Sequence, residues 1–147
     1  MSLINELREK SNKAETTKQE VIAEIKAYFD EYLDSNNLEN FLKKTIKKEE
    51  IAERKLFTMV EFWEYHDGCS DTSFYCCGKY WHNPENSYNI QSWDYKGIRL
   101  MDIQMEICTY LRAKLIRRME ELQFNLIKEE KQKGRFGYFN THLYFGW

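Results

Sequence analysis

The chain has one proline and six glycines in 147 residues, and no two glycines are adjacent. Isolated glycines exclude a glycine-rich phosphate loop, and a G-x-S-x-G nucleophile elbow is also missing. No apolar run approaches the length of a membrane span. The first residues, Met1–Glu6, have neither the basic nor the apolar part of a signal peptide. We therefore expect a cytoplasmic protein with no membrane contact.

An excess of charge of one sign is lacking too. The 22 basic and 24 acidic residues leave a net charge of −2. Proteins dedicated to nucleic acid usually carry a clear basic excess, so nucleic acid is not an expected partner.

Four cysteines are few for a disulfide-stabilised secreted domain and suit free thiols in a reducing compartment. The frequent Lys, Glu, Ile and Asn are typical of compact bacterial or phage proteins.

Aromatic residues, in contrast, are abundant: four Trp, ten Tyr and nine Phe. Most lie in two stretches, Phe57–Tyr95 and Phe136–Trp147, whose composition favours β-strands. Because aromatics occupy both alternating faces, a sheet built from these stretches would have two apolar faces. Helices of the same chain can cover one face. The other face then needs a partner subunit, a partner protein or a ligand.

The first third of the chain is predicted to be helical. Apolar residues from Ile4 to Tyr32 recur at three-four spacing, interrupted by Ser11 and Lys18. Thr17, followed by a glutamate three residues later, can form a capping box, so a firm helix is expected to start near it. This helix docks on its own sheet or, alternatively, reaches a second subunit through a short coiled-coil seam. A stop and a new start are expected at Asp34–Asn37.

The rest of the chain completes a single α+β domain. Helices are expected over residues 1–54, a β-meander over 55–97, one long helix over 98–134 and a final strand over 135–147. The four strands form one mostly antiparallel sheet with the helices on one face. The strands of the meander are expected at Leu56–His66, Ser73–His82, with a bulge at Gly78, and Tyr88–Lys96. The long helix is expected from Arg99 to Lys133, with an apolar stripe from Leu100 to Leu126 and Gly134 as its C-cap.

Two histidines and three cysteines, His66, Cys69, Cys76, Cys77 and His82, could in principle supply zinc ligands. Their spacing contains no C-x-x-C pair. If the first two strands form a hairpin, His82 lies roughly 30 Å from the connecting loop. Cys76 and Cys77, adjacent in a strand, would point to opposite faces. Cys69 beside His66 lacks an oxyanion hole. We therefore expect no metal, no cofactor and no catalytic residue.

Four cations gather along one edge of the apolar stripe of the predicted long helix. Cations beside aromatic rings can clamp a phosphate or a carboxylate. Alternatively, their stems cover the edge of the core and their charges stay in water. The candidate ligand-binding residues are Arg99, Lys114, Arg117, Arg118, Tyr75, Tyr80, Trp81 and Trp93.

These features favour a small non-enzymatic interaction protein. We expect it to self-associate as a homodimer and to cover an aromatic sheet face with a partner protein, as an inhibitor or sequestering accessory protein would. The alternative is a protein or enzyme that binds a small anionic, nucleotide-like molecule. Its aromatic and arginine-lined pocket would lie between the sheet and the long helix.

Overall fold

The computed structural model describes residues 2–46, 56–64, 73–85, 94–133 and 139–147. This part of the chain is a mixture of helices and strands, which confirms the α+β class. The helices are α1 (Leu3–Leu33), α2 (Asn37–Ile46) and α4 (Leu100–Glu121). The strands are β1 (Leu56–Glu64), β2 (Ser73–Cys76), β3 (Lys79–His82), β4 (Asp94–Tyr95), β5 (Ile98–Arg99), β6 (Asn125–Lys133) and β7 (Phe139–Gly146).

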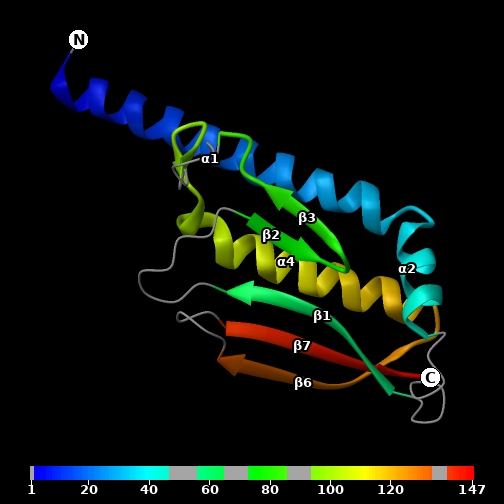
Figure 1. Cartoon of the computed structure of the whole chain (residues 1–147). Helices are drawn as coiled ribbons and strands as arrows, with labels where there is room; N and C mark the ends of the chain where they lie inside the picture. Colours follow the sequence, from blue (N-terminus) through cyan, green and yellow to red (C-terminus); the bar gives the residue numbers. More distant parts are fainter. Residues whose placement is uncertain (1, 47–55, 65–72, 86–93, 134–138) are drawn as a thin grey trace.

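The strands do not form the single four-stranded sheet that the sequence predicted. β1, β7 and β6 make a three-stranded antiparallel sheet in that order, while β2–β3 and β4–β5 are separate two-stranded hairpins. The last strand of the chain therefore lies in the centre of the larger sheet, with Phe145 opposite Phe57 on one side and Leu126 on the other. β2 runs beside β1, and α4 packs behind the strands while α1 lies beyond β3 (Figure 1).

Two tight turns explain why the predicted meander was wrong. The predicted strand Ser73–His82 is a hairpin, because Cys77 and Gly78 turn the chain with φ of 49° and 82°. Lys96 and Gly97, at 52° and 77°, join β4 to β5 in the same way, and residues 88–93 of the third predicted strand lie outside the described residues. Two consecutive positive φ angles match the right-handed twist of paired strands, which is why such turns close hairpins.

The long helix also ends earlier than predicted. α4 stops at Glu121, where Gln123 adopts a φ of 70°. The N–H of Phe124 then donates to the carbonyl of Met119, and that of Gln123 to the carbonyl of Glu120, both at 2.9 Å. This Schellman motif closes the helix with a glutamine where glycine is usual. The residues predicted as its last turns form β6, and the predicted C-cap at 134 lies outside the described residues.

α1 is one continuous helix and does not begin near Thr17. Ser2 caps its first turn, accepting from the N–H of Asn5 at 3.2 Å, and Thr17 instead donates its hydroxyl to the carbonyl of Lys13. The predicted break at Asp34–Asn37 is confirmed, since α1 ends at Leu33 and α2 begins at Asn37. A 31-residue helix spans far more than the face that α4 covers. Part of it therefore projects from the rest of the molecule (Figure 1).

The core lies between the C-terminal half of α1, α4 and the strands. Its apolar side chains come from both the helices and the strands. Phe74, Trp81 and Tyr95 form an aromatic cluster, in which the ring centroids of Phe74 and Trp81 are 5.7 Å apart and those of Trp81 and Tyr95 are 5.5 Å apart. The largest completely buried side chains are Ile22, Ile25, Phe29, Leu33, Leu38, Ile103, Ile107, Leu111, Leu115, Met119 and Phe145.

The left-handed Gln123 gives a direct test of the helix terminus. Gln123→Gly should raise the free energy of unfolding by about 0.5–1 kcal/mol, because glycine adopts a positive φ without a steric penalty. Glu120→Gly, in the last turn of the same helix, should lower it by about 1 kcal/mol. Urea denaturation of both variants measures the two shifts, and a destabilised Gln123→Gly would contradict this view of the α4 terminus.

Candidate functional site

The aromatic residues that the structure describes serve mainly the chain's own core. Phe74, Trp81, Tyr95 and Phe145 are buried, whereas Tyr80 and Trp147 are exposed. The side chains of β1 and of residues 139–142 are outside the described set. A second apolar face on the larger sheet therefore stays a prediction.

Lys114, one of the predicted ligand-binding cations, is buried between α4 and the end of α1. Its side chain is 7% exposed, and its Nζ lies 2.7 Å from Asp30 and 2.9 Å from Asp34. The hydroxyl of Tyr110 also donates to Asp30, at 2.6 Å. Desolvation alone would lower the pKa of Lys114, but its hydrogen bonds to the two carboxylates outweigh it and raise the pKa. Lys114 therefore links α4 to the end of α1 through ion pairs with Asp30 and Asp34, and these contacts are here named the α1–α4 tie.

Arg118, one turn farther along α4, completes this tie. Its Nε donates to the carbonyl of Leu33 at 2.9 Å, and its Nη1 to Glu121 at 2.5 Å. The last turn of α1 contains no basic residue of its own. A cation from α4 thus satisfies a terminal carbonyl and lies at the negative end of the α1 dipole. Two of the four cations predicted to lie along this edge, Lys114 and Arg118, are thus used to hold α1.

The remaining predicted site residues are dispersed over other elements. Arg99 ends β5 opposite Asp94, and Arg117 is exposed on α4. Tyr80 on β3 stacks on His82 with ring centroids 5.5 Å apart, while its neighbour Trp81 joins the aromatic core cluster. The side chain of Tyr75 and the whole of Trp93 lie outside the described residues.

The cysteine and histidine cluster is arranged differently from the prediction. Because the chain turns at Cys77–Gly78, His82 lies opposite Ser73, so the prediction that it lies roughly 30 Å from the loop before Ser73 is wrong. Cys76 and Cys77 do not point to opposite faces either, since their sulfurs are 3.9 Å apart. Within the described ranges no three His, Cys, Asp or Glu residues are grouped as metal ligands, and the loop that carries the other predicted ligands, residues 65–72, lies outside those ranges.

The first half of α1 is the most unusual surface of the described structure. Residues 2–16, here named the projecting segment, are all exposed, including Leu3 (69%), Ile4 (60%) and Leu7 (53%). Val21, Ile22 and Ile25 follow these three at a distance of 18 residues, which is five helical turns at about 3.6 residues per turn. Because the later three are buried, the exposed apolar residues continue the docked face of α1 into the part of the helix that projects from the rest of the molecule.

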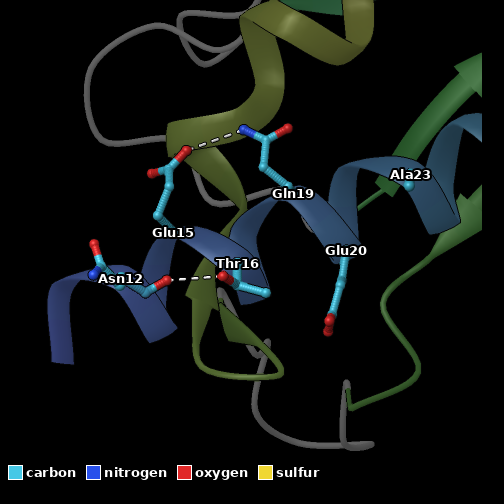
Figure 2. A pocket seen from close by; sticks show the side chains of 6 residues that line it. All are labelled: Asn12, Glu15, Thr16, Gln19, Glu20 and Ala23. Carbon is cyan, nitrogen blue, oxygen red and sulfur yellow. Dashed lines mark hydrogen bonds between the residues drawn. The ribbon is translucent and has the colours of Figure 1, made fainter. Parts of the chain in front are cut away.

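A shallow depression lies on another side of the same helix (Figure 2). It is lined by Asn12, Glu15, Thr16, Gln19, Glu20 and Ala23. Gln19 donates to Glu15 at 3.1 Å and Thr16 to the carbonyl of Asn12 at 2.9 Å. These polar groups already bind one another within α1, so this lining offers no set of convergent groups for catalysis.

No known protein family matches the chain, and neither curated proteins nor solved structures give a match. Among the described helices, none is long and apolar enough to cross a bilayer.

The tie at the end of α1 predicts different roles for two neighbouring arginines. Arg118→Ala should lower the free energy of unfolding by about 1–2 kcal/mol, because the carbonyl of Leu33 loses its charged donor. Arg117→Ala, at an exposed position, should change it by less than about 0.5 kcal/mol. Thermal and urea denaturation compare the two. Equal stability of both variants would mean that Arg118 does not hold α1.

The same tie predicts loss of stability in alkali. Burial and the bond to Asp30 raise the pKa of Tyr110, and the pKa of Lys114 is raised as well. A group whose pKa is raised in the folded state contributes to the stability of the fold. This contribution is complete at pH values below the group's ordinary pKa, which is 10.0 for Tyr and 10.5 for Lys, and it is lost as the pH rises through the folded-state pKa. Urea midpoints should therefore be level up to about pH 9 and fall above about pH 10.

Tyr110→Phe tests the assignment of this alkaline loss. The variant removes one of the titrating groups, so its fall above about pH 10 should be smaller than that of the wild type. It should not vanish, because the bond to Glu24 raises the pKa of Tyr95 in the same direction. An unchanged alkaline fall in Tyr110→Phe would contradict the assignment.

Proposed function

We propose that the protein is a non-catalytic interaction protein that self-associates as a homodimer through the projecting segment of α1. The observation that carries the proposal is the exposure of Leu3, Ile4 and Leu7 on a helix whose other half is docked. Exposed apolar residues that continue a buried face mark an interaction surface more strongly than scattered ones. The helix is already folded, so binding would not have to order it, and this lowers the free-energy cost of association.

The direction of the face favours antiparallel pairing of the two segments. The exposed apolar residues lie on the same face of α1 as the buried Val21, Ile22 and Ile25, and α4 is among the elements that contact α1. A second α1 that ran parallel on that side would collide with the rest of the first molecule. In an antiparallel pair each N-terminus ends where the docked part of the other copy begins, so the docked parts of the two copies lie at opposite ends of the helix pair.

Side-chain sizes along the segment support the same arrangement. Large residues, Ile4 and Leu7, lie near its start, and small residues, Ser11 and Ala14, follow on the same face. With the two-fold axis near Glu9, Ile4 lies opposite Ala14 of the second copy and Leu7 opposite its Ser11. Each layer then pairs a large with a small side chain, which lets the helices approach closely.

Charges within the segment are balanced. Three glutamates and three basic residues leave residues 2–16 neutral. Two copies of the segment can therefore approach each other without a repulsion between net charges. Two helices of this length bury less than the roughly 800 Å² per partner of a standard interface, so the dimer should dissociate on dilution.

The alternative, a protein that binds a small anionic molecule, finds less support in the described contacts. Lys114 and Arg118, the cations closest to the core, are already occupied by α1. Arg99, Arg117 and Tyr80 are exposed on separate elements. A partner protein on the second face of the larger sheet remains the second form of the interaction proposal.

A charge placed on the apolar face should separate the subunits. Leu7→Glu is expected to be monomeric at concentrations where the wild type is dimeric, because it buries a carboxylate against the second helix. Thr16→Glu adds the same charge half a turn away on the helix and should leave the dimer intact. Sedimentation equilibrium at increasing concentration measures both. A wild-type mass of 17.9 kDa at every concentration up to about 1 mM would overturn the proposal.

A further inference from the structure

Cys76 and Cys77 form a pair of adjacent thiols in direct contact. Both side chains are fully buried, and their Sγ atoms are 3.9 Å apart. Successive residues of a strand normally point to opposite faces. Here β2 ends at Cys76, and Cys77 is the first residue of the turn with a φ of 49°. The change of backbone conformation between them brings both sulfurs to the same side.

Cysteine is an unusual choice for this turn position. Two-residue hairpin turns with two positive φ angles favour Asn, Asp or Gly at their first position, because other residues are strained there. A buried cysteine that only filled space would not need this position. Strain held by the surrounding structure at a reactive group is a reason to look for function.

We propose that Cys76 and Cys77 form a redox-active dithiol that closes into a disulfide within the hairpin turn. The oxidant class is a low-molecular-weight disulfide such as oxidised glutathione. The thiolate of one cysteine attacks a sulfur of the oxidant, forms a mixed disulfide and releases one reduced thiol. The thiolate of the second cysteine then attacks the protein sulfur and releases the other reduced thiol. The protein loses two protons and two electrons, and one oxidant molecule becomes two thiols.

The ring closed by this reaction is strained, so the reaction is readily reversed. Neighbouring Cα atoms are about 3.8 Å apart, whereas disulfide-linked cysteines usually have Cα atoms about 4.4–6.8 Å apart. Strained disulfides have more oxidising potentials than structural ones and suit switching. A ring of two residues also removes almost no entropy from the unfolded chain, so it cannot stabilise the fold as a long-range disulfide does.

Contacts with α1 control access to the pair. Tyr32 donates its hydroxyl to the carbonyl of Cys77 at 2.7 Å, and Tyr28 donates to the carbonyl of Tyr80 at 2.5 Å. Burial raises the pKa of the Cys77 thiol, so the docked hairpin keeps it protonated and unreactive. Gly78, the next residue, is exposed. Release of the hairpin from α1 therefore opens the dithiol to solvent.

Treatment of the purified protein with oxidised glutathione, followed by intact-mass and peptide mass spectrometry, tests the chemistry. The wild type should lose two hydrogen atoms at Cys76–Cys77 and retain no glutathione there, and dithiothreitol should reverse the change. Cys77→Ser should instead retain glutathione at Cys76, and Cys108→Ser should behave as the wild type. Stable glutathione adducts on wild-type Cys76 or Cys77, or no reaction there even in mild urea, would overturn the proposal.

The gating contact has its own test. Tyr32→Phe removes the hydroxyl that holds Cys77, so ring closure should be several-fold faster than in the wild type. Tyr144→Phe removes a hydroxyl that bonds Glu130 on the larger sheet and should leave the rate unchanged. Circular dichroism confirms that both variants are folded. Equal rates in all three proteins would show that α1 does not control the dithiol.

Discussion

The attachment of the end of α1 to α4 is the contact on which the other elements depend. The two helices run parallel, since Lys26 meets Glu106 at one end and Asp34 meets Lys114 at the other. Parallel packing places like ends of two helix dipoles side by side, which is unfavourable. The cations of α4 offset this by lying next to the C-terminal carbonyls and carboxylates of α1. A buried lysine is tolerated there because two carboxylates replace its water.

Once α1 is fixed, it positions both small hairpins. Tyr28 and Tyr32 bond the backbone of the β2–β3 hairpin, and the ammonium group of Lys79 lies over their rings at 4.9 and 5.9 Å. Nearer the projecting segment, Glu24 accepts from the hydroxyl of Tyr95 at 2.7 Å and lies 3.1 Å from Lys96 in the β4–β5 turn. One helix face therefore carries apolar core residues at its centre and hydrogen-bonding residues along its flanks.

Sequence reasoning was reliable where the signal is local. Helical periodicity, the break at Asp34–Asn37, the first strand and a final strand all follow from patterns within a few residues. It failed where ordinary residues adopt positive φ. Cys77, Lys96 and Gln123 carry no turn signal in the sequence, although each reverses or ends an element. Two of them are followed by glycine, and that pairing was the clue available.

The candidate site was likewise predictable from the sequence only in its local features. The helical wheel correctly put Lys114 and Arg118 near the apolar edge of α4, but their partners lie about eighty residues earlier in the chain. Such tertiary contacts leave no periodic trace. The interrupted seam of α1 was also visible in the sequence, whereas the place where the body ends along it was not.

The unbroken backbone of α1 joins its free and docked halves into one rod. At about 1.5 Å per residue, the projecting segment extends roughly 20 Å from the body. A sideways force applied at Leu7 therefore acts as a torque on the docked half of the helix, where Tyr28 and Tyr32 bond the backbone of the β2–β3 hairpin. A force on the free end of α1 is in this way transmitted to the turn that carries the two adjacent thiols.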